Sequence, residues 1–527
     1  MENSKKNLKT YNKYMSGIRI CDWMLFLYLV AVLGVFPWFL HDAYFDITIT
    51  KYKFIITATF SYIILFVMAY VIETLICYAL TNNFKDTYIN SVEVKKSWKR
   101  PGFWAVAFML ANIFAYIVSV DQTSSMTGSK GRYMGCMMYV LMCIMFLMVS
   151  SRAFLNAVLL IIFGCATFFS YFVAIMQHAG NDFMGYKEGI SHKSYYIFTS
   201  TFGNINIFAS FISISLPIFL ALYIFSKKLI WKIPSAILVI SGGMCLIISN
   251  SDSVYLGVGA AFILLFFISY YNGQFTSFVE AVFMMAIGNL LVVIMRMTVE
   301  CEYDKNRGGV AEVIDKPSVA VAMVVMIVLV YVAVLIGKKK LGDKLELLNK
   351  KKVILTMSII MVVAFVLVIV YGNIKKISLF TFDYEWGTYR GYIWIKCMEL
   401  FEEAPLTNKL FGYGNETLKM LTTTNFYEEM IDVTGKTYDN AHNEVLQYLV
   451  TTGLVGALSY IGMFLSSVVY IIKNAKKNAI AYACGASIVG YFVQGLINVN
   501  QPITTPYFFV IMAMGVGYVR YMKKAES

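Results

Sequence analysis

The chain has 527 residues, of which 59% are hydrophobic and only 14% are charged. Apolar runs of about 20 residues recur along it, and each can cross a hydrocarbon core of about 30 Å. This composition excludes a separate soluble domain and predicts an all-α polytopic membrane protein. The net charge of +13 does not indicate nucleic acid as a partner. Much of it lies in short loops between apolar runs, the pattern that orients membrane proteins.

Fourteen transmembrane helices are predicted from the apolar runs, and together they form a single integral membrane domain over residues 1–527. In chain order the predicted spans cover about 21–40, 54–80, 103–120, 134–150, 153–177, 206–225, 233–249, 254–271, 277–296, 318–337, 353–372, 446–472, 479–498 and 507–520.

Basic residues orient these spans. With the N-terminus inside, the short inner segments hold 27 Lys and Arg residues, against 17 in outer segments of nearly twice the length. This asymmetry places both termini of a multi-pass protein in the cytoplasm. It also places one long loop, 373–445, outside.

The long outer loop has helical and turn signals of its own. A roughly helical apolar pattern covers 388–403 and includes Trp394, which suits a helix lying at headgroup level. Pro405 is expected to end this helix, and Gly412 and Gly414 predict a turn. The loop carries 7 basic and 11 acidic residues.

Arg390, the only arginine in this loop, is the first candidate site residue. A guanidinium at the outer interface matches a phosphate or diphosphate in bidentate geometry. The alternatives are ordinary phospholipid anchoring or an ion pair with Glu385 or Glu402.

His442 is the second candidate, at the point where the loop enters the next apolar run. A neutral imidazole can accept a proton from an attacking hydroxyl, because its pKa lies near working pH. Asn443 and Asp439 could orient the ring. The alternative is an interfacial histidine that caps the next helix. The chain's four histidines show no spacing that would indicate a metal site.

Asp252 is the third candidate, in the tight turn before the eighth span. A carboxylate at the depth of the membrane is costly and often functional. We therefore expect Asp252 to face a polar cavity and to pair with a basic residue such as Arg390. Asp also serves well as a helix N-cap, which is the alternative. Asn204 and Asn206 form a weaker candidate pair, since turn-forming asparagines are common.

Three segments resemble the signature of the O-antigen ligase and O-antigen polymerase superfamily. The clearest is Ala441-His442-Asn443-Glu444 followed by Gly453-Leu454-Val455-Gly456. The segment 202–209 resembles the family's Gly-Asn-Pro-Asn motif, with isoleucine at the proline position. The third runs from Tyr389-Arg390 through 412–414. The resemblance spans about residues 130 to 520.

This resemblance implies a GT-C-like glycosyltransferase of polysaccharide assembly. The donor would be an oligosaccharide on undecaprenyl diphosphate at the outer leaflet. Arg390 would hold the diphosphate, and His442 would lie beside the acceptor hydroxyl. No cofactor, metal or nucleotide sugar would be needed. The expected partners are membrane lipids, with a flippase and a chain-length regulator as candidates, and no nucleic acid.

One position departs from the family pattern. The family often has Ser-Arg before the eighth span, whereas this chain has Ser251-Asp252. Either another basic residue contacts the diphosphate, such as Arg307 or Lys305, or the substrate differs.

Several functional alternatives stay open on the sequence. A polymerase is favoured over a ligase that attaches glycan to a lipid or wall anchor. The alternative of another class is a lipid-linked oligosaccharide flippase or transporter, although no internal repeat is visible and charges within the spans are few. A catalytically inactive scaffold is the remaining alternative.

The topology is open to a direct test with single introduced cysteines. Because 373–445 is expected outside, a cysteine at Thr423 should react with an impermeant reagent in intact cells, and one at Asn349 should stay protected. The opposite labelling pattern would invert the orientation and remove the basis for an external active site.

Overall fold

The computed structural model describes residues 19–81, 99–128, 131–152, 157–303, 309–347, 350–377 and 380–525. Lys305, Arg307 and Asn349 lie outside these ranges. Within them, all regular secondary structure is helical, as the composition predicts.

Ten helical segments are long and apolar enough to cross a membrane. They are the run α2–η1–η2 (Ile20–Trp38), α3 (Ile47–Thr81), α7 (Ala157–His178), α8 (Ile205–Phe225), α9 (Leu229–Ile248), α10 (Asp252–Tyr271), α11 (Phe275–Thr298), α13 (Pro317–Leu347), α14 (Lys350–Ile374) and α19 (Gly453–Asn474). Three shorter apolar helices are α4 (Pro101–Ile117), α6 (Cys136–Ser151) and α20 (Ala479–Gly495). Helix α21 (Thr505–Ala525) occupies the last predicted span. The multi-span helical fold is confirmed, and the number fourteen stays a prediction.

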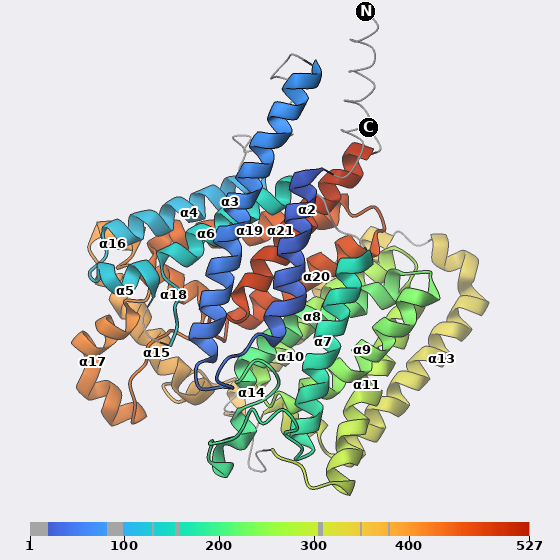
Figure 1. Ribbon diagram of the computed structural model, residues 1–527. Coiled ribbons are helices and arrows are strands. Elements are labelled where there is room, and N and C mark those ends of the chain that lie inside the picture. The colour runs from blue at the N-terminus through green and yellow to red at the C-terminus, as the bar shows by residue number, and fades with distance from the viewer. Residues whose placement is uncertain are drawn as a thin grey trace, which may run out of the picture.

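Helix α8 lies at the centre of the bundle and packs on α9, α10 and α20 (Figure 1). Nearly all of its side chains are buried, in agreement with a sequence that is apolar all round. By contrast, α13 and α14 leave most of their apolar side chains exposed on the protein surface. Such uniformly apolar, exposed helices suit contact with lipid chains.

The long loop forms a compact lobe of three helices beside the bundle, namely α15 (Trp386–Glu402), α16 (Leu406–Phe411) and α17 (Leu418–Thr434) (Figure 1). Two of the residues that predicted a helix at the membrane surface, Tyr392 and Ile393, lie in a small core within the lobe, and the position of this helix at the membrane surface stays a prediction. That core includes Tyr392, Ile393, Cys397, Leu400, Leu418, Leu421 and Met430. Helix α15 ends at Glu402, before Pro405 as predicted, and Pro405 is the N-cap residue of α16.

The span expected at 446–472 is broken into two helices. A short helix, α18 (Glu444–Thr451), ends before Gly453, where φ is +68° and α19 begins. The turn at Gly412 and Gly414 fits into this break: the amide of Tyr413 donates to the carbonyl of Val450 (3.1 Å), and that of Gly414 to the carbonyl of Thr451 (2.9 Å). In a continuous helix the carbonyls of Val450 and Thr451 would accept from amides of the same helix instead.

Both glycines at the break are required by close backbone approach. A Cβ on Gly453 would overlap the backbone of Leu410, and one on Gly412 would overlap the backbone of Thr451. Each also has a positive φ, where a side chain is strained. The break therefore fixes the lobe against the bundle.

We expect Gly453→Ala to lower the Tm of the detergent-purified protein more than Gly435→Ala does. Gly435 also has a positive φ, of +70°, but open space around it, so its substitution measures the left-handed strain alone, about 1–2 kcal/mol. The overlap at Gly453 adds to that strain. Equal losses in Tm would show that the lobe can move away from the break.

Candidate active site

The segment 438–443, which we call the His442 loop, connects α17 to α18 and is fastened to α15. The indole of Trp394 donates to the carbonyl of Ala441 (2.9 Å), and the hydroxyl of Tyr438 donates to the carbonyl of Thr388 (3.3 Å). These bonds hold the His442 loop beside the start of α15, which carries Arg390.

His442 itself has a left-handed backbone, with φ of +51°. Its amide donates to the side chain of Asn440 (2.8 Å), and its buried Nδ1 atom has no hydrogen-bond partner among the described residues. The residue that caps α18 is Asn443, whose side chain accepts from the amide of Leu446 (3.0 Å). His442 thus does not serve as the cap that the alternative interpretation requires.

Arg390 is the first residue of α15 with helical geometry, after three residues with positive φ. Its Nη1 atom donates to the carbonyl of Gly387 (3.3 Å), and its buried Nε atom has no partner in the described part of the chain. Over the same residues, Asp252 is the one carboxylate whose charge affects the pKa of the guanidinium, and the ion pairs considered with Glu385 and Glu402 are not formed. The guanidinium thus keeps capacity for an anionic ligand.

The electrostatics place Arg390 and His442 in one neighbourhood. Burial, followed by the positive charges of Arg390 and Arg132, lowers the pKa of His442 from 6.5 to about 3, with Asp439 opposing the shift. Burial also lowers the pKa of Arg390, and the charges of Tyr438 and Asp252 oppose that change. The site therefore combines a desolvated cation with an imidazole that is neutral in the free protein.

Sequence reasoning missed Arg132, which lies between α5 (Gln122–Thr127) and α6. Its Nε and Nη2 atoms donate to the two carboxylate oxygens of Asp439, at 3.1 and 2.7 Å. Asp439 was expected to orient the ring of His442, but its carboxylate is held by this bidentate pair. No spacing in the sequence could reveal a partner 307 residues away.

Glu444, directly after the His-Asn pair, was also missed. It is buried, and its carboxylate accepts hydrogen bonds from the hydroxyls of Tyr460 (2.6 Å) and Tyr491 (2.8 Å). These bonds tie the start of α18 to α19 and α20. Its position two residues after His442 was the feature of the sequence that could have identified it.

Asp252 is the first residue of α10, and its side chain is exposed. Its carboxylate accepts from the amide of Val310 (3.1 Å), at the start of α12 (Val310–Ile314). In the described chain no ion pair within 4.0 Å joins Asp252 to Arg390, although the charge of Asp252 acts to raise the pKa of Arg390. The expected direct pair is thus not formed, because an exposed carboxylate is stabilised by water and needs no buried partner.

The two asparagines make contacts typical of a scaffold. Asn204 caps α8 by accepting from the amide of Asn206 (2.8 Å). The side-chain oxygen of Asn206 accepts from the hydroxyl of Ser251 (2.7 Å), and its carbonyl accepts from Asn498 (2.9 Å). They link α8 to the turn before α10 and to the end of α20.

A cavity of about 550 Å³ lies between α15 and α18. Its walls include Trp394, Glu399, Glu402 and Asn443, and the remaining lining is mostly apolar. Aromatic, carboxylate and amide groups together suit a polyhydroxylated ligand. Among the described residues, no group of three His, Cys, Asp or Glu side chains could hold a metal ion.

Residues 317–461 match the family model described as O-antigen ligase. This region of the chain is similar to the O-antigen ligase family. The match contains Arg390, His442, the lobe and the helix break at Gly453, and it confirms the resemblance to the O-antigen ligase and polymerase superfamily. No curated protein matches the chain.

The low pKa of His442 predicts how kcat/KM, which reports the free protein, depends on pH. A group with a pKa of about 3 stays neutral as pH falls from 7 to 5, so kcat/KM should lose no activity through His442 in that range. The measurement is kcat/KM against pH for the wild type and His442→Gln. An acid limb near pH 6.5 that disappears in His442→Gln would contradict the expected environment.

Proposed function

We propose that the protein is a glycosyltransferase of bacterial cell-surface polysaccharide assembly, with a glycan on undecaprenyl diphosphate as donor and an acceptor sugar hydroxyl at the outer face of the membrane. The observation that carries the proposal is the pairing of Arg390 and His442. Within the matched region, each has a buried nitrogen without a partner among the described residues, and the charge of Arg390 lowers the pKa of His442.

In the proposed reaction the acceptor oxygen forms a bond to the anomeric carbon of the donor glycan, while the bond from that carbon to the diphosphate breaks. The hydroxyl proton passes to the imidazole of His442, and undecaprenyl diphosphate leaves. Arg390 neutralises the negative charge that grows on the leaving group, and its fork geometry matches a diphosphate. His442 later returns its proton to water.

The donor itself would activate the base. An imidazole with a pKa of about 3 is a weak base at neutral pH, first because it is buried and then because of the positive charges of Arg390 and Arg132. A diphosphate bound at Arg390 offsets those positive charges and raises the pKa of His442. Proton acceptance is then coupled to donor binding, which would limit wasteful reaction in the empty site.

The other residues have proposed roles around this pair. Asn443 and the wall of the neighbouring cavity would contact the acceptor, and Asp252, near the guanidinium, would limit how anions approach it. Asn204 and Asn206 would act by positioning the turn that carries Asp252. Arg307, like Lys305, is the candidate for a second cation at the diphosphate.

We favour a polymerase, whose acceptor is another lipid-linked glycan, located in the plasma membrane with both termini cytoplasmic. The cavity that Asn443 lines together with Trp394, Glu399 and Glu402 supports a sugar acceptor. The length of the product distinguishes the two activities: a polymerase lengthens lipid-linked glycan, whereas a ligase moves it to an anchor without lengthening.

We expect His442→Ala to reduce transfer by about 10²–10⁴, the usual contribution of general-base catalysis. Arg390→Lys should also be impaired, because lysine keeps the charge but loses bidentate binding. The assay uses purified protein in liposomes with a lipid-diphosphate-linked oligosaccharide, and follows product length.

Exposed His192 supplies the control, and His192→Ala should transfer at the wild-type rate. Donor binding should persist in His442→Ala and weaken in Arg390→Lys. A folded His442→Ala protein with the wild-type rate would exclude the catalytic role of His442.

A further inference from the structure

A basic groove lies at the opposite ends of the two helices that reach the lobe. Helix α4 begins at this groove and ends near the turn at Gly414, while α19 begins at Gly453 and ends at the groove. The groove has a volume of about 640 Å³. It lies at the ends of α4 and α19 that point away from the lobe and His442, and it is not part of the site described above.

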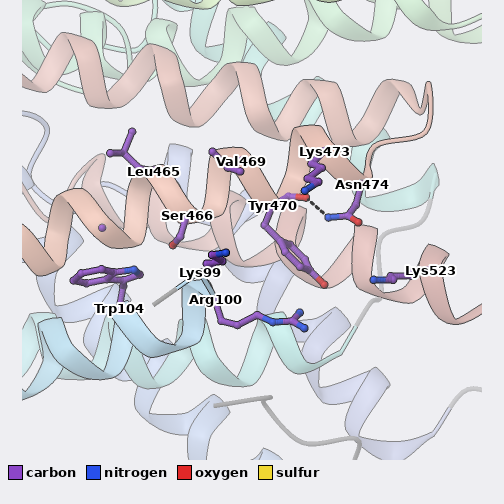
Figure 2. Close-up of a pocket in the computed structure, with 11 residues that line it drawn as sticks. Lys99, Arg100, Trp104, Leu465, Ser466, Val469, Tyr470, Lys473, Asn474 and Lys523 are labelled. Atoms are coloured by element: carbon purple, nitrogen blue, oxygen red, sulfur yellow. Dashed lines mark hydrogen bonds between the residues drawn. The ribbon is translucent and has the colours of Figure 1, made fainter. Parts of the chain in front are cut away.

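The groove has one charged end and one apolar end. Figure 2 shows Trp104 at one end, Lys473 and Lys523 at the other, and Lys99 and Arg100 between them. Among the described lining residues four are cationic and none is acidic. The guanidinium of Arg100 also lies over the ring of Tyr470, 5.8 Å from its centroid. Charge complementarity therefore favours an anion at this end.

The apolar end follows one face of α19. Gly462, Leu465, Val469 and Lys473 recur at helical spacing, and Leu465 and Val469 are more than half exposed, at 52% and 60%. From Gly462 to Lys473 the helix rises about 16 Å, which matches the thickness of one leaflet, about 15 Å.

The absence of a side chain at Gly462 lets the indole of Trp104 pack directly against α19 and close this end of the groove. A Cβ there would overlap the indole of Trp104. A second small cavity, next to the first, shares Arg100 and Tyr470 and adds Arg520. The cationic surface thus continues from α19 to α21, at the level where headgroups would lie.

We propose that this groove binds one anionic phospholipid, with its phosphate at Lys473, Lys523 and Arg100 and one acyl chain along the Gly462–Val469 face. The lipid would fill the space between α4 and α19. Because both helices continue to the lobe, an occupied groove would hold the ends of α4 and α19 that lie away from the lobe in place.

The test uses the full-length protein in detergent and measures lipid binding by native mass spectrometry. Phosphatidylglycerol should bind at least ten-fold more tightly than phosphatidylcholine. The double variant Lys473→Glu/Lys523→Glu should lose this preference. The matched control is Lys227→Glu/Lys228→Glu, which makes the same change in net charge at exposed residues outside the groove and should keep it.

A second variant tests the contribution of the lipid's acyl chain apart from that of its headgroup. Leu465→Asp, at a side chain that is 52% exposed in the groove, should weaken binding of long-chain phosphatidylglycerol while leaving binding of a short-chain analogue unchanged, and the Tm without lipid monitors folding. Three results would overturn the proposal: equal affinity for the two lipids, inorganic phosphate that competes as well as lipid, or a polyprenyl phosphate that displaces phosphatidylglycerol at equal concentration.

Discussion

The close backbone contact between the turn at Gly412 and the helix break at Gly453 is the constraint on which the rest of the structure depends. It replaces two turns of a continuous membrane helix by a short helix, α18, and a second start at α19. The lobe can then dock its own backbone on the carbonyls freed at the end of α18. Because α18 follows directly on the His442 loop, the same contact fixes the position of the imidazole.

The second constraint is the burial of the positively charged side chain of Arg390 at the edge of the lobe. Arg390 and Arg132 both act on His442, but only Arg132 has a carboxylate partner at bonding distance in the described structure. An arginine held partly buried without a counter-ion costs free energy, which an anionic ligand would recover. The site is thereby preorganised for a negatively charged leaving group.

Beneath the site, polar side chains connect α18 to the bundle and helices of the bundle to one another. Glu444 joins three helices through two tyrosine hydroxyls, and Asn206 joins α8 to the turn before α10. Directional bonds of this kind fix the rotation of each helix, which apolar contact alone leaves less defined. At the other end of α4 and α19, the basic groove leaves space that a lipid could occupy, so the two ends of the same helices would be stabilised by different means.

The sequence by itself determined the membrane class, the helical content and the identity of Arg390 and His442 as candidates. Hydrophobic runs must be buried in lipid as helices, and that rule acts locally. The tertiary structure decided what depends on distant partners: the break at Gly453, the Arg132–Asp439 pair, the tyrosines around Glu444 and the exposed position of Asp252. A glycine's φ is set by the backbone that approaches it, and an ion pair across 307 residues is set by the fold, so neither leaves a local pattern to read.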